Sequence, residues 1–466
     1  MNIKERDSDA TGYQSLDILR RKIDDAYLQD EAECLAGLLE LANSDLVTAH
    51  NIEFRARDLV DHVRDNIKKQ DSIEAFLREY SLSSEEGVVL MCLAESLLRI
   101  PDNGTADRLI RDKIAPAEWH KHKGVSRSLF VNASTWGLML TGNLVNVGRS
   151  SSENLSVFSN LLSRVGEPVI RTVLRQAMKL MGAQYVMGSD IESACSRSIK
   201  SFHANTRFSF DMLGEAALSN KDAEAYYVAY QQAIRYLSEH RNATDTLFES
   251  ASISIKLSAL HPRYEFSQKA RIMDELIPRV QALAELACAG QVALTLDAEE
   301  ADRLDLSLDV FQAIKLTKNI KPWDGFGLAV QAYQKRAYPV LMYLCELASL
   351  CQSKIPVRLV KGAYWDTEIK RAQEAGLESY PVFTRKPSTD VSYLACAKYL
   401  IQHCDTFFPQ FATHNAHTLA AILEFAKNEK QIEFQRLHGM GESLYSSIIE
   451  QIPCRVYAPV GSYKDL

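Results

Sequence analysis

Ionisable and amide side chains recur in the second half of the chain, next to short apolar segments. Asp211, Lys256, Asp297, Gln331 and Arg358 each stand near the end of such a segment, and so do Lys361, Lys386, His414, Asn415 and His438. If the segments are parallel strands, their carboxyl ends meet at one edge, where barrel active sites lie. The pattern therefore predicts one shared site. The alternative for Asp211 and His438 is pairing with neighbours that closes the top of a barrel.

The densest of these segments is RLVKGAYWD, residues 358–366, which combines two cations with a glycine and two large aromatics. Gly362 would let backbone N–H groups approach a ligand closely. Tyr364 and Trp365 could stack on a planar ring, and TRK at 384–386 adds a hydroxyl and two more cations. A flat, anionic, phosphate-bearing cofactor fits this composition. The alternative for the two aromatics is a place in the core.

Two other chemistries compete with this interpretation. His414 and His417 stand three residues apart and His438 follows the next apolar segment, so a catalytic metal is conceivable. No paired histidine occurs in the first segment, however, and no metal site is expected. A nucleophile elbow of the form G-x-S-x-G is absent from the sequence.

The apolar segments alternate with amphipathic stretches such as 222–240, 271–289 and 338–351. Eight candidate strands follow residue 205, at 208–213, 252–259, 292–298, 326–333, 356–364, 381–385, 408–414 and 433–438. This count predicts an α/β fold, a distorted (βα)8 barrel of the TIM type. A doubly wound open sheet is the alternative, but the sequence has no G-x-G-x-x-G segment and no P-loop.

The first half of the chain has apolar residues at helical spacing and predicts an all-helical region before the barrel. We expect a helical arm over 1–66, an all-helical domain over 67–188 and the barrel over 189–466. The arm carries charges on both sides of an apolar stripe. It is either an ordinary surface helix pair or a segment that packs on a partner chain, giving a homodimer.

Composition narrows the class of protein. The formal net charge of -7 argues against nucleic acid as a partner, because phosphate binding needs clustered cations. The nine cysteines are scattered and form no C-x-x-C pair, which favours reduced thiols in a cytoplasmic protein. No apolar run reaches the length of a membrane-spanning helix.

The segment RLVKGAYWDTEIKRAQ (358–373) resembles the signature of proline dehydrogenase in the proline utilization A family. The similarity extends over nearly the whole chain. It includes SLSSEEGVVLMCLAESLLRIPD (81–102), SLFVNASTWGLMLTG (128–142), FSFDMLGEAAL (208–218), SIKLSALHPRY (254–264), LDAEEADRL (296–304), VQAYQKRA (330–337), PQFATHNAHTLAA (409–421), LHGMGE (437–442) and CRVYAPVG (454–461). The resemblance implies a (βα)8 barrel holding FAD, which oxidises L-proline to 1-pyrroline-5-carboxylate by hydride transfer to flavin N5.

The same resemblance implies roles for individual residues. Arg358 would hydrogen-bond near flavin N5, while Lys256 and Asp297 frame the substrate and Tyr457 bonds to Asp297. Leu437 and Tyr364 would pack on the proline ring. The remaining cofactor contacts implied by the family motif are Gln331, Val360, Gly362, Ala363, Tyr364, Trp365, Thr384, Lys386 and His414. No general base is obvious, so proline would bind with its amine unprotonated.

The sequence also departs from the family pattern. Members continue after YAPVG with a helix whose Arg-Arg pair holds the proline carboxylate, and this sequence ends at Leu466. An inactive flavin-binding or scaffold fragment is therefore the alternative function. The family's aldehyde dehydrogenase half is not represented, nor is the ribbon–helix–helix segment of its trifunctional members. The family further implies a membrane quinone as electron acceptor and a peripheral contact with the inner membrane.

Overall fold

In the computed structural model, residues 3–67, 185–201 and 204–461 are described, apart from 428 and 430, together with Thr105. The chain divides into two units. One comprises Met1–Lys68 and Met187–Gly461, and the other comprises Lys69–Val186 with Ser462–Leu466. The all-helical domain expected over 67–188 lies almost wholly outside the described residues.

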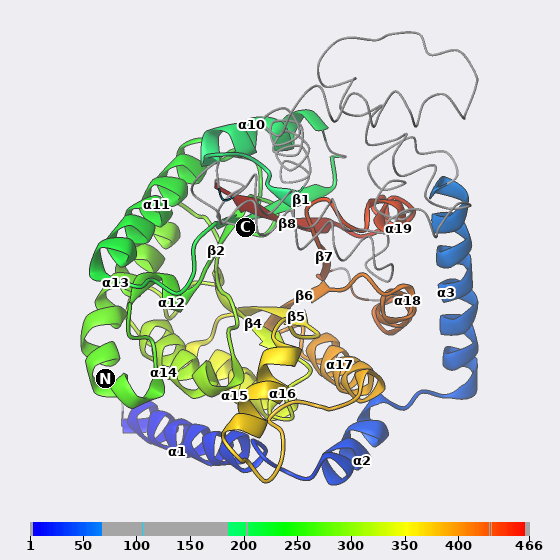
Figure 1. Cartoon of the computed structure of the whole chain (residues 1–466), viewed down its shortest axis with the longest axis horizontal. Helices are drawn as coiled ribbons and strands as arrows, with labels where there is room; N and C mark the ends of the chain where they lie inside the picture. Colours follow the sequence, from blue (N-terminus) through cyan, green and yellow to red (C-terminus); the bar gives the residue numbers. More distant parts are fainter. Residues whose placement is uncertain are drawn as a thin grey trace. The chain divides into compact units, whose positions relative to one another are not determined.

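The first unit contains a closed barrel of eight parallel strands in which sequence neighbours pair around the ring (Figure 1). The ring closes because β8 pairs with β1 along its whole length, from Thr206 beside Cys454 to Met212 beside Val460. The strands are β1 Thr206–Met212, β2 Ser252–Ile255, β3 Leu294–Leu296, β4 Phe326–Gln331, β5 Ile355–Val360, β6 Phe407–Ala412, β7 Glu433–Leu437 and β8 Cys454–Val460. The (βα)8 fold predicted from the sequence is confirmed.

The predicted number of strands is correct, but one of the eight predicted strands is wrong and one real strand was missed. Residues 381–385 form no barrel strand, since Val382 makes only an isolated antiparallel bridge to Gln334. Lys386, which we expected just past a sixth strand, is instead the first residue of a helix. The missing strand is β8, which pairs with both β7 and β1 and was not predicted.

Helices cover the outside of the barrel. The predicted helices at 222–240, 271–289 and 338–351 are confirmed as α11 Asn220–Glu239, α13 Lys269–Ala289 and α15 Ala337–Cys351. α11 begins with a capping box, in which Ser219 and Asp222 satisfy each other's backbone N–H groups. The other described elements of this layer are α10 Ile191–Ser201, α12 Leu257–Leu260, η2 Phe266–Gln268, η3 Ala301–Arg303, α14 Leu304–Lys315, α16 Trp365–Glu374, α17 Lys386–Gln402, α18 Ala416–Phe425 and α19 Glu442–Tyr445.

The strands alternate between an apolar outer face and a polar interior. In β5, Ile355, Val357 and Leu359 are fully buried within the main hydrophobic cluster. Arg358 lies between them in sequence and bonds to side chains on three other strands and to Asp297, which follows β3, so it points into the barrel. From the sequence we placed Arg358, like the other polar residues of the site, near the end of an apolar segment. Arg358 instead lies within β5 and faces the interior, because alternate residues of one strand face opposite sides of the sheet.

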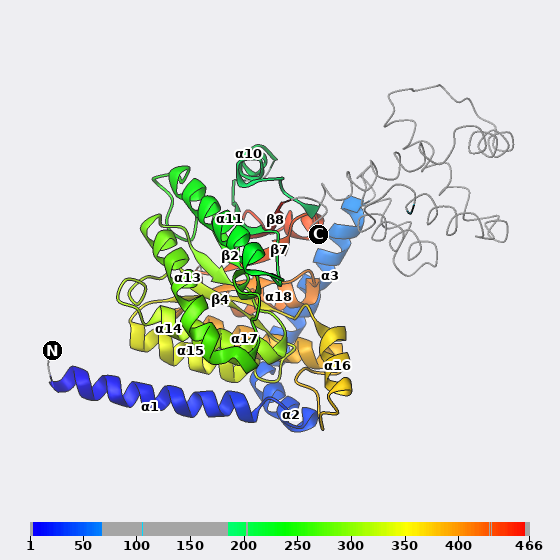
Figure 2. The ribbon, with the colours of Figure 1, turned by 60° about the vertical axis from the view of Figure 1, so that its left-hand side comes forward.

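Three helices of the N-terminal arm wrap around the side of the barrel (Figures 1 and 2). They are α1 Ile3–Asp25, α2 Glu31–Ala42 and α3 Leu46–Ile67, and they pack along α15, α17 and α18 respectively. Arg20 of α1 bonds to Asp309 of α14 over 3.0 Å. The guanidinium of Arg336 lies 4.5 Å from the ring centre of Tyr27. The expected helix pair is thus three helices, held to the chain's own barrel by apolar and charged contacts.

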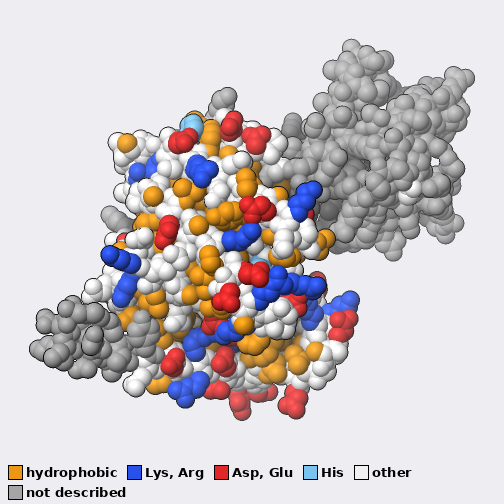
Figure 3. Space-filling model, turned by 90° about the vertical axis from the view of Figure 1, so that its left-hand side faces the viewer, with side chains coloured by type: hydrophobic (Ala, Val, Ile, Leu, Met, Phe, Trp, Pro, Cys, Tyr) orange, Lys and Arg blue, Asp and Glu red, His pale blue; other side chains and the backbone are white. Residues whose placement is uncertain are grey.

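The surface that carries α10, α11, α13 and α14 shows acidic and basic side chains interspersed, without a large field of one sign (Figure 3). Within the described ranges, no helix is both long and apolar enough to cross a membrane. The eight cysteines in these ranges are free thiols, four of them buried.

Candidate active site

Arg358 is the centre of a polar cluster inside the barrel. Its Nε donates to Oε1 of Gln435 on β7 over 2.7 Å, and its Nη1 donates to Asp297, which follows β3. Its Nη2 donates to Ser209 Oγ on β1 (3.1 Å) and to Ser254 Oγ on β2 (2.8 Å). The two serine hydroxyls are 3.0 Å apart and also bond to each other. Side chains of three strands and of the residue that follows a fourth therefore fix one guanidinium group.

Asp297 joins Arg358 to the other residues expected in the site. Tyr457 of β8 donates its hydroxyl proton to Asp297 Oδ2 over 2.7 Å, and its ring centre lies 5.0 Å from the guanidinium carbon of Arg358. Lys256, which follows β2, has its Nζ 3.9 Å from the same carboxylate oxygen. The structure thus brings together the four residues that the sequence analysis expected to be catalytic.

Lys256 also pairs with a second carboxylate. Its Nζ donates to Oδ2 of Asp211 over 2.7 Å, and the other oxygen of Asp211 is buried without a hydrogen-bond partner among the described residues. Burial alone would lower the pKa of Lys256, but the charges of Asp211 and Asp297 raise it above its usual value. Burial, together with the nearby Asp297, raises the pKa of Asp211. The site therefore keeps Lys256 cationic and leaves one buried oxygen of Asp211 without a hydrogen-bond partner in the described part of the chain.

The loop after β5 forms the rim above Arg358. Gly362 has a φ of +144°, which disfavours other residues, and a Cβ built there would lie 2.4 Å from ring atoms of Tyr333. Ala363 donates its backbone N–H to Gln331 Oε1 over 3.2 Å. Trp365 donates to the Phe383 carbonyl but leaves 42% of its surface exposed. The loop thus presents an exposed backbone and an exposed aromatic surface, as a planar cofactor would require.

Gln331 connects this rim to the loop after β3. Its amide nitrogen donates to the carbonyl of Glu299 over 2.7 Å, while its oxygen accepts from Ala363. The side chain is 4% exposed, so both ends of the amide are used internally. Gln331 therefore ties two loops at the barrel mouth together.

The remaining expected contacts lie around the same mouth. Thr384 is exposed, and both its N–H and its hydroxyl donate to the Glu31 carboxylate of α2, over 3.0 and 2.8 Å. Lys386 is exposed at the start of α17. His414 accepts from the backbone N–H of Leu437 over 3.1 Å, and burial, helped by the Arg436 charge, lowers its pKa. Leu437 is 45% exposed. These residues could contact a ligand, although Thr384 already bonds to the arm.

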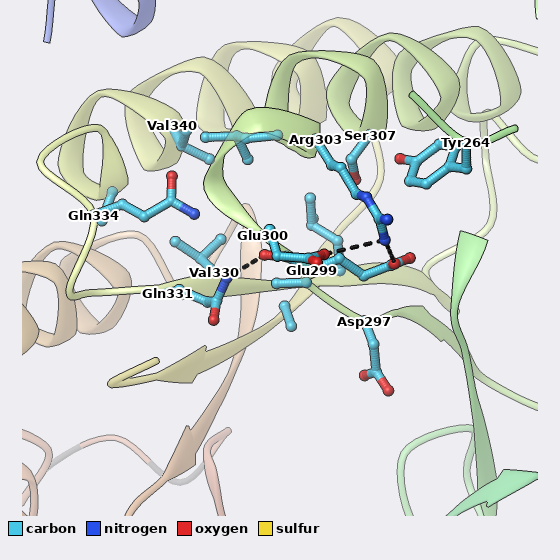
Figure 4. A pocket seen from close by; sticks show the side chains of 15 residues that line it. Tyr264, Asp297, Glu299, Glu300, Arg303, Ser307, Val330, Gln331, Gln334 and Val340 are labelled. Carbon is cyan, nitrogen blue, oxygen red and sulfur yellow. Dashed lines mark hydrogen bonds and ion pairs between the residues drawn. The ribbon is translucent and has the colours of Figure 1, made fainter. Parts of the chain in front are cut away.

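A small cavity lies beside the site, and Asp297 and Gln331 of the site are among the residues that line it. It is lined by Leu328 and Val330 of β4 and by side chains of α14 and α15. In Figure 4 the Asp297 side chain points away from the group formed by Glu299 and Arg303. Arg358, Lys256 and Tyr457 do not line this cavity, which therefore lies at the edge of the site, between the sheet and the helices α14 and α15.

Three residues of the cluster were not predicted as site residues, namely Ser209, Ser254 and Gln435. Each occupies an alternate position of its strand, as in FSFDM, SISIK and EFQRL. A search for polar residues at every second position would have found them. In the part of the chain that the structure describes, no group of three or more His, Cys, Asp or Glu is arranged to hold a metal ion.

A closed (βα)8 barrel with a buried Arg–Asp–Lys–Tyr cluster near its C-terminal mouth defines the general class of barrel enzymes. Comparison with known sequences specifies the family. The family model described as "Proline dehydrogenase" matches residues 195–466, and the one described as "Proline utilization A proline dehydrogenase N-terminal domain" matches 18–64. The chain belongs to the proline dehydrogenase family.

Individual relatives agree with this assignment. The chain is 47% identical to the bifunctional protein PutA of Escherichia coli K12 over 462 residues, which are 96% of this chain and 35% of that protein. It is 25% identical to proline dehydrogenase 1 of Bacillus subtilis over 290 residues, which are 61% of this chain and 83% of that protein. A crystal structure of a Bradyrhizobium japonicum proline utilization A variant aligns with a TM-score of 0.70 and 45% identity, covering 94% of this chain and 44% of that one. The chain thus spans about a third of the PutA relative's length.

One match runs against an expectation from composition. Residues 72–185 match a family model described as "DNA-binding domain of Proline dehydrogenase". We expected no nucleic-acid partner because the net charge is negative. The matched segment lies almost entirely outside the described residues, and its family description names the binding that we did not expect.

Proposed function

We propose that this chain binds FAD at the barrel mouth and oxidises L-proline to 1-pyrroline-5-carboxylate. The observation that carries the proposal is the Arg358 cluster together with the rim above it. FAD, when bound, would supply the hydride acceptor at N5. The residues of the chain would bind and orient both molecules and hold charge in place.

The groups around the mouth suit a flavin. A flat ring system needs exposed backbone and aromatic surface, which Gly362, Ala363 and Trp365 offer. The pyrophosphate needs cations and hydroxyls, which Thr384 and Lys386 would supply at the start of α17. The positive φ of Gly362 and its missing Cβ let this loop lie close against the ring of Tyr333.

Arg358 is suited to a hydrogen bond with flavin N5. A guanidinium carries five N–H donors, and four of them bond to Gln435, Asp297, Ser209 and Ser254. Among the described residues, none accepts from the second Nη1 hydrogen. We infer that this donor meets N5, where negative charge develops on reduction, and one such donor is worth roughly 3–4 kcal/mol in related sites.

Lys256 and Asp211 would serve the substrate. The Lys256 amine is held cationic between two carboxylates and supplies a point charge for the carboxylate of proline. The unpartnered oxygen of Asp211 is an acceptor for an amine hydrogen. Tyr364 and Leu437 would pack against the ring, since a saturated ring needs an apolar wall.

Electrons would then pass to a quinone, through a peripheral membrane contact. Because a quinone resides in the bilayer, the chain should reduce it faster in the presence of vesicles. We expect proline-dependent reduction of a short-chain quinone in solution and a higher rate of long-chain quinone reduction with anionic vesicles.

The experiment that tests the function is the absorbance spectrum of the purified chain with FAD, before and after anaerobic addition of proline. We expect flavin absorbance that bleaches with L-proline, and an Arg358→Met variant that retains FAD but bleaches far more slowly. If the chain takes up FAD and proline leaves the flavin oxidised, this chain is a flavin-binding fragment. If it takes up no FAD, the proposal is wrong.

A further inference from the structure

A fully buried acid lies at the base of the Arg358 cluster. Glu433 begins β7 with 0% exposure and receives two bonds from Arg455 of β8, over 2.6 and 3.0 Å. Arg207 of β1 adds a contact of 3.2 Å. Burial raises the pKa of Glu433, but the Arg455 and Arg207 charges outweigh it and the net direction is down. Glu433 is therefore a carboxylate, which can only accept hydrogen bonds.

Gln435 lies between this carboxylate and Arg358. Its amide nitrogen donates to Glu433 Oε1 over 3.0 Å, and its amide oxygen accepts from Arg358 Nε over 2.7 Å. The side chain is 1% exposed, so water does not substitute for either partner. One neighbour only accepts and the other only donates, so the amide has a single favourable orientation.

We propose that Gln435 is a positioning residue for the reaction and that Glu433 acts through it to fix the plane of the Arg358 guanidinium. This inference rests on the proposed function, in which one Nη1 hydrogen of Arg358 reaches flavin N5. The hydrogen bond from Nε matters most for the direction of the Nη1 hydrogen. Without it, the guanidinium can rotate about the last side-chain bonds, and both Nη groups move. Ser209, Ser254 and Asp297 accept from the two Nη groups, whereas Gln435 accepts from Nε.

The chain offers a matched control for a purely structural role. Gln410 of β6 also donates to Glu433 Oε1, over 2.8 Å, and is also buried, at 5% exposure. The structure gives it no hydrogen bond to Arg358. Gln435→Met and Gln410→Met therefore remove the same kind of donor from the same carboxylate, and only the first also removes an acceptor from Arg358.

The experiment compares the two variants with the parent chain after FAD loading. Five quantities are measured: the flavin midpoint potential, the dissociation constant for FAD, kcat for proline, KM for proline, and the thermal midpoint. We expect Gln435→Met to lower kcat about tenfold, as for loss of one charge-assisted hydrogen bond, and to make the potential more negative. Gln410→Met should lower the thermal midpoint less than Gln435→Met does, since it removes one buried hydrogen bond where the other removes two, and its kcat and potential should be like those of the parent.

A second variant tests the donor–acceptor pattern itself. In Gln435→Glu, an ionised side chain repels Glu433, whereas a protonated one donates to Glu433 and accepts from Arg358, as the amide does. The charged groups around it are Glu433, Arg358 and Arg455. Relative to the parent at each pH, kcat and the potential of this variant should recover as the pH falls.

Two results would overturn the inference. One is an equal effect of Gln435→Met and Gln410→Met on potential and kcat, which would make Gln435 structural. The other is a crystal structure of Gln435→Met without cofactor in which the Arg358 guanidinium has not moved. The second readout does not depend on flavin chemistry, so it separates failure of this inference from failure of the proposed function.

Discussion

Tyr457 donates its hydroxyl proton to Asp297 over 2.7 Å, although 160 positions separate the two residues in the chain. The bond spans the barrel interior from β8 to the residue that follows β3. Asp297 accepts from Arg358 on its other oxygen, so the phenol and the guanidinium share one carboxylate. The orientation of Asp297 therefore depends on Tyr457.

Replacing Tyr457 by Phe should slow proline oxidation without releasing FAD. A hydrogen bond to a charged group contributes about 1.5–3 kcal/mol, so we expect kcat to fall by roughly tenfold to a hundredfold. The ring over Arg358 is retained in Tyr457→Phe, and stacking should persist. Stopped-flow flavin reduction by proline measures the effect, and unchanged reduction would show that Asp297 needs no second donor.

Replacing Gly362 by Ala should abolish cofactor uptake. The added Cβ would meet the Tyr333 ring at 2.4 Å and would require an unfavourable φ of +144°. Gly376→Ala is the control, since Gly376 also has a positive φ, +62°, but no atom lies within 4 Å of its added Cβ. The control should cost about 1 kcal/mol of stability and retain FAD. Fluorescence titration with FAD distinguishes the two variants. If they bind FAD with equal affinity, the loop is not part of the cofactor site.

Removing the charge of Glu31 should tighten FAD binding. The Glu31 carboxylate bonds to Thr384, which we propose as a contact for the cofactor's phosphates, and like charges repel there. Glu31→Gln keeps an acceptor for Thr384 but removes the repulsion. For an exposed pair of like charges, removing the repulsion should improve the free energy of FAD binding by about 0.3–1 kcal/mol, which lowers the dissociation constant roughly twofold to fivefold. This difference should be smaller at high salt. Glu33→Gln on the exposed side of α2 is the control. Weaker FAD binding in Glu31→Gln would mean that the arm orders Thr384 for the cofactor.

Stability should fall as the pH drops from 7 to 5. Burial, with the Arg197 and Arg436 charges nearby, lowers the pKa of His438 to about 4. An unfolded histidine titrates near 6.5, so below that pH the unfolded state binds a proton that the folded state excludes. The pKa is depressed on folding, so this stability is present above pH 6.5 and lost below it, by about 2 kcal/mol at pH 5.

Urea unfolding at both pH values measures the loss of stability, and His438→Gln should show a smaller loss. An equal loss in the variant would assign the effect to other groups, such as His414, whose pKa is also lowered.

The fold could be predicted from the sequence because the outer faces of the strands are apolar at every second residue. Segments such as 252–259 and 326–333 alternate with amphipathic stretches, and their number implied a barrel. Two local errors cancelled in that count. Residues 381–385 have strand-like composition but pair with Gln334 alone, and β8 follows Pro453 and contains Pro459. Pairing partners decide whether such a segment is a strand, and they lie far away in sequence.

The main residues of the site were predicted from the sequence, but the hydrogen bonds among them were not. Arg358, Asp297, Lys256 and Tyr457 were recognised from motifs, because long ordered motifs identify a family. The roles of Ser209, Ser254 and Gln435 emerge only when the ring closes and brings their three strands around the guanidinium of Arg358. Sequence by itself determined which residues carry charge and which strand faces are apolar. The tertiary structure decided which donors meet which acceptors, since those contacts depend on the closure of the barrel and on the inward direction of each side chain.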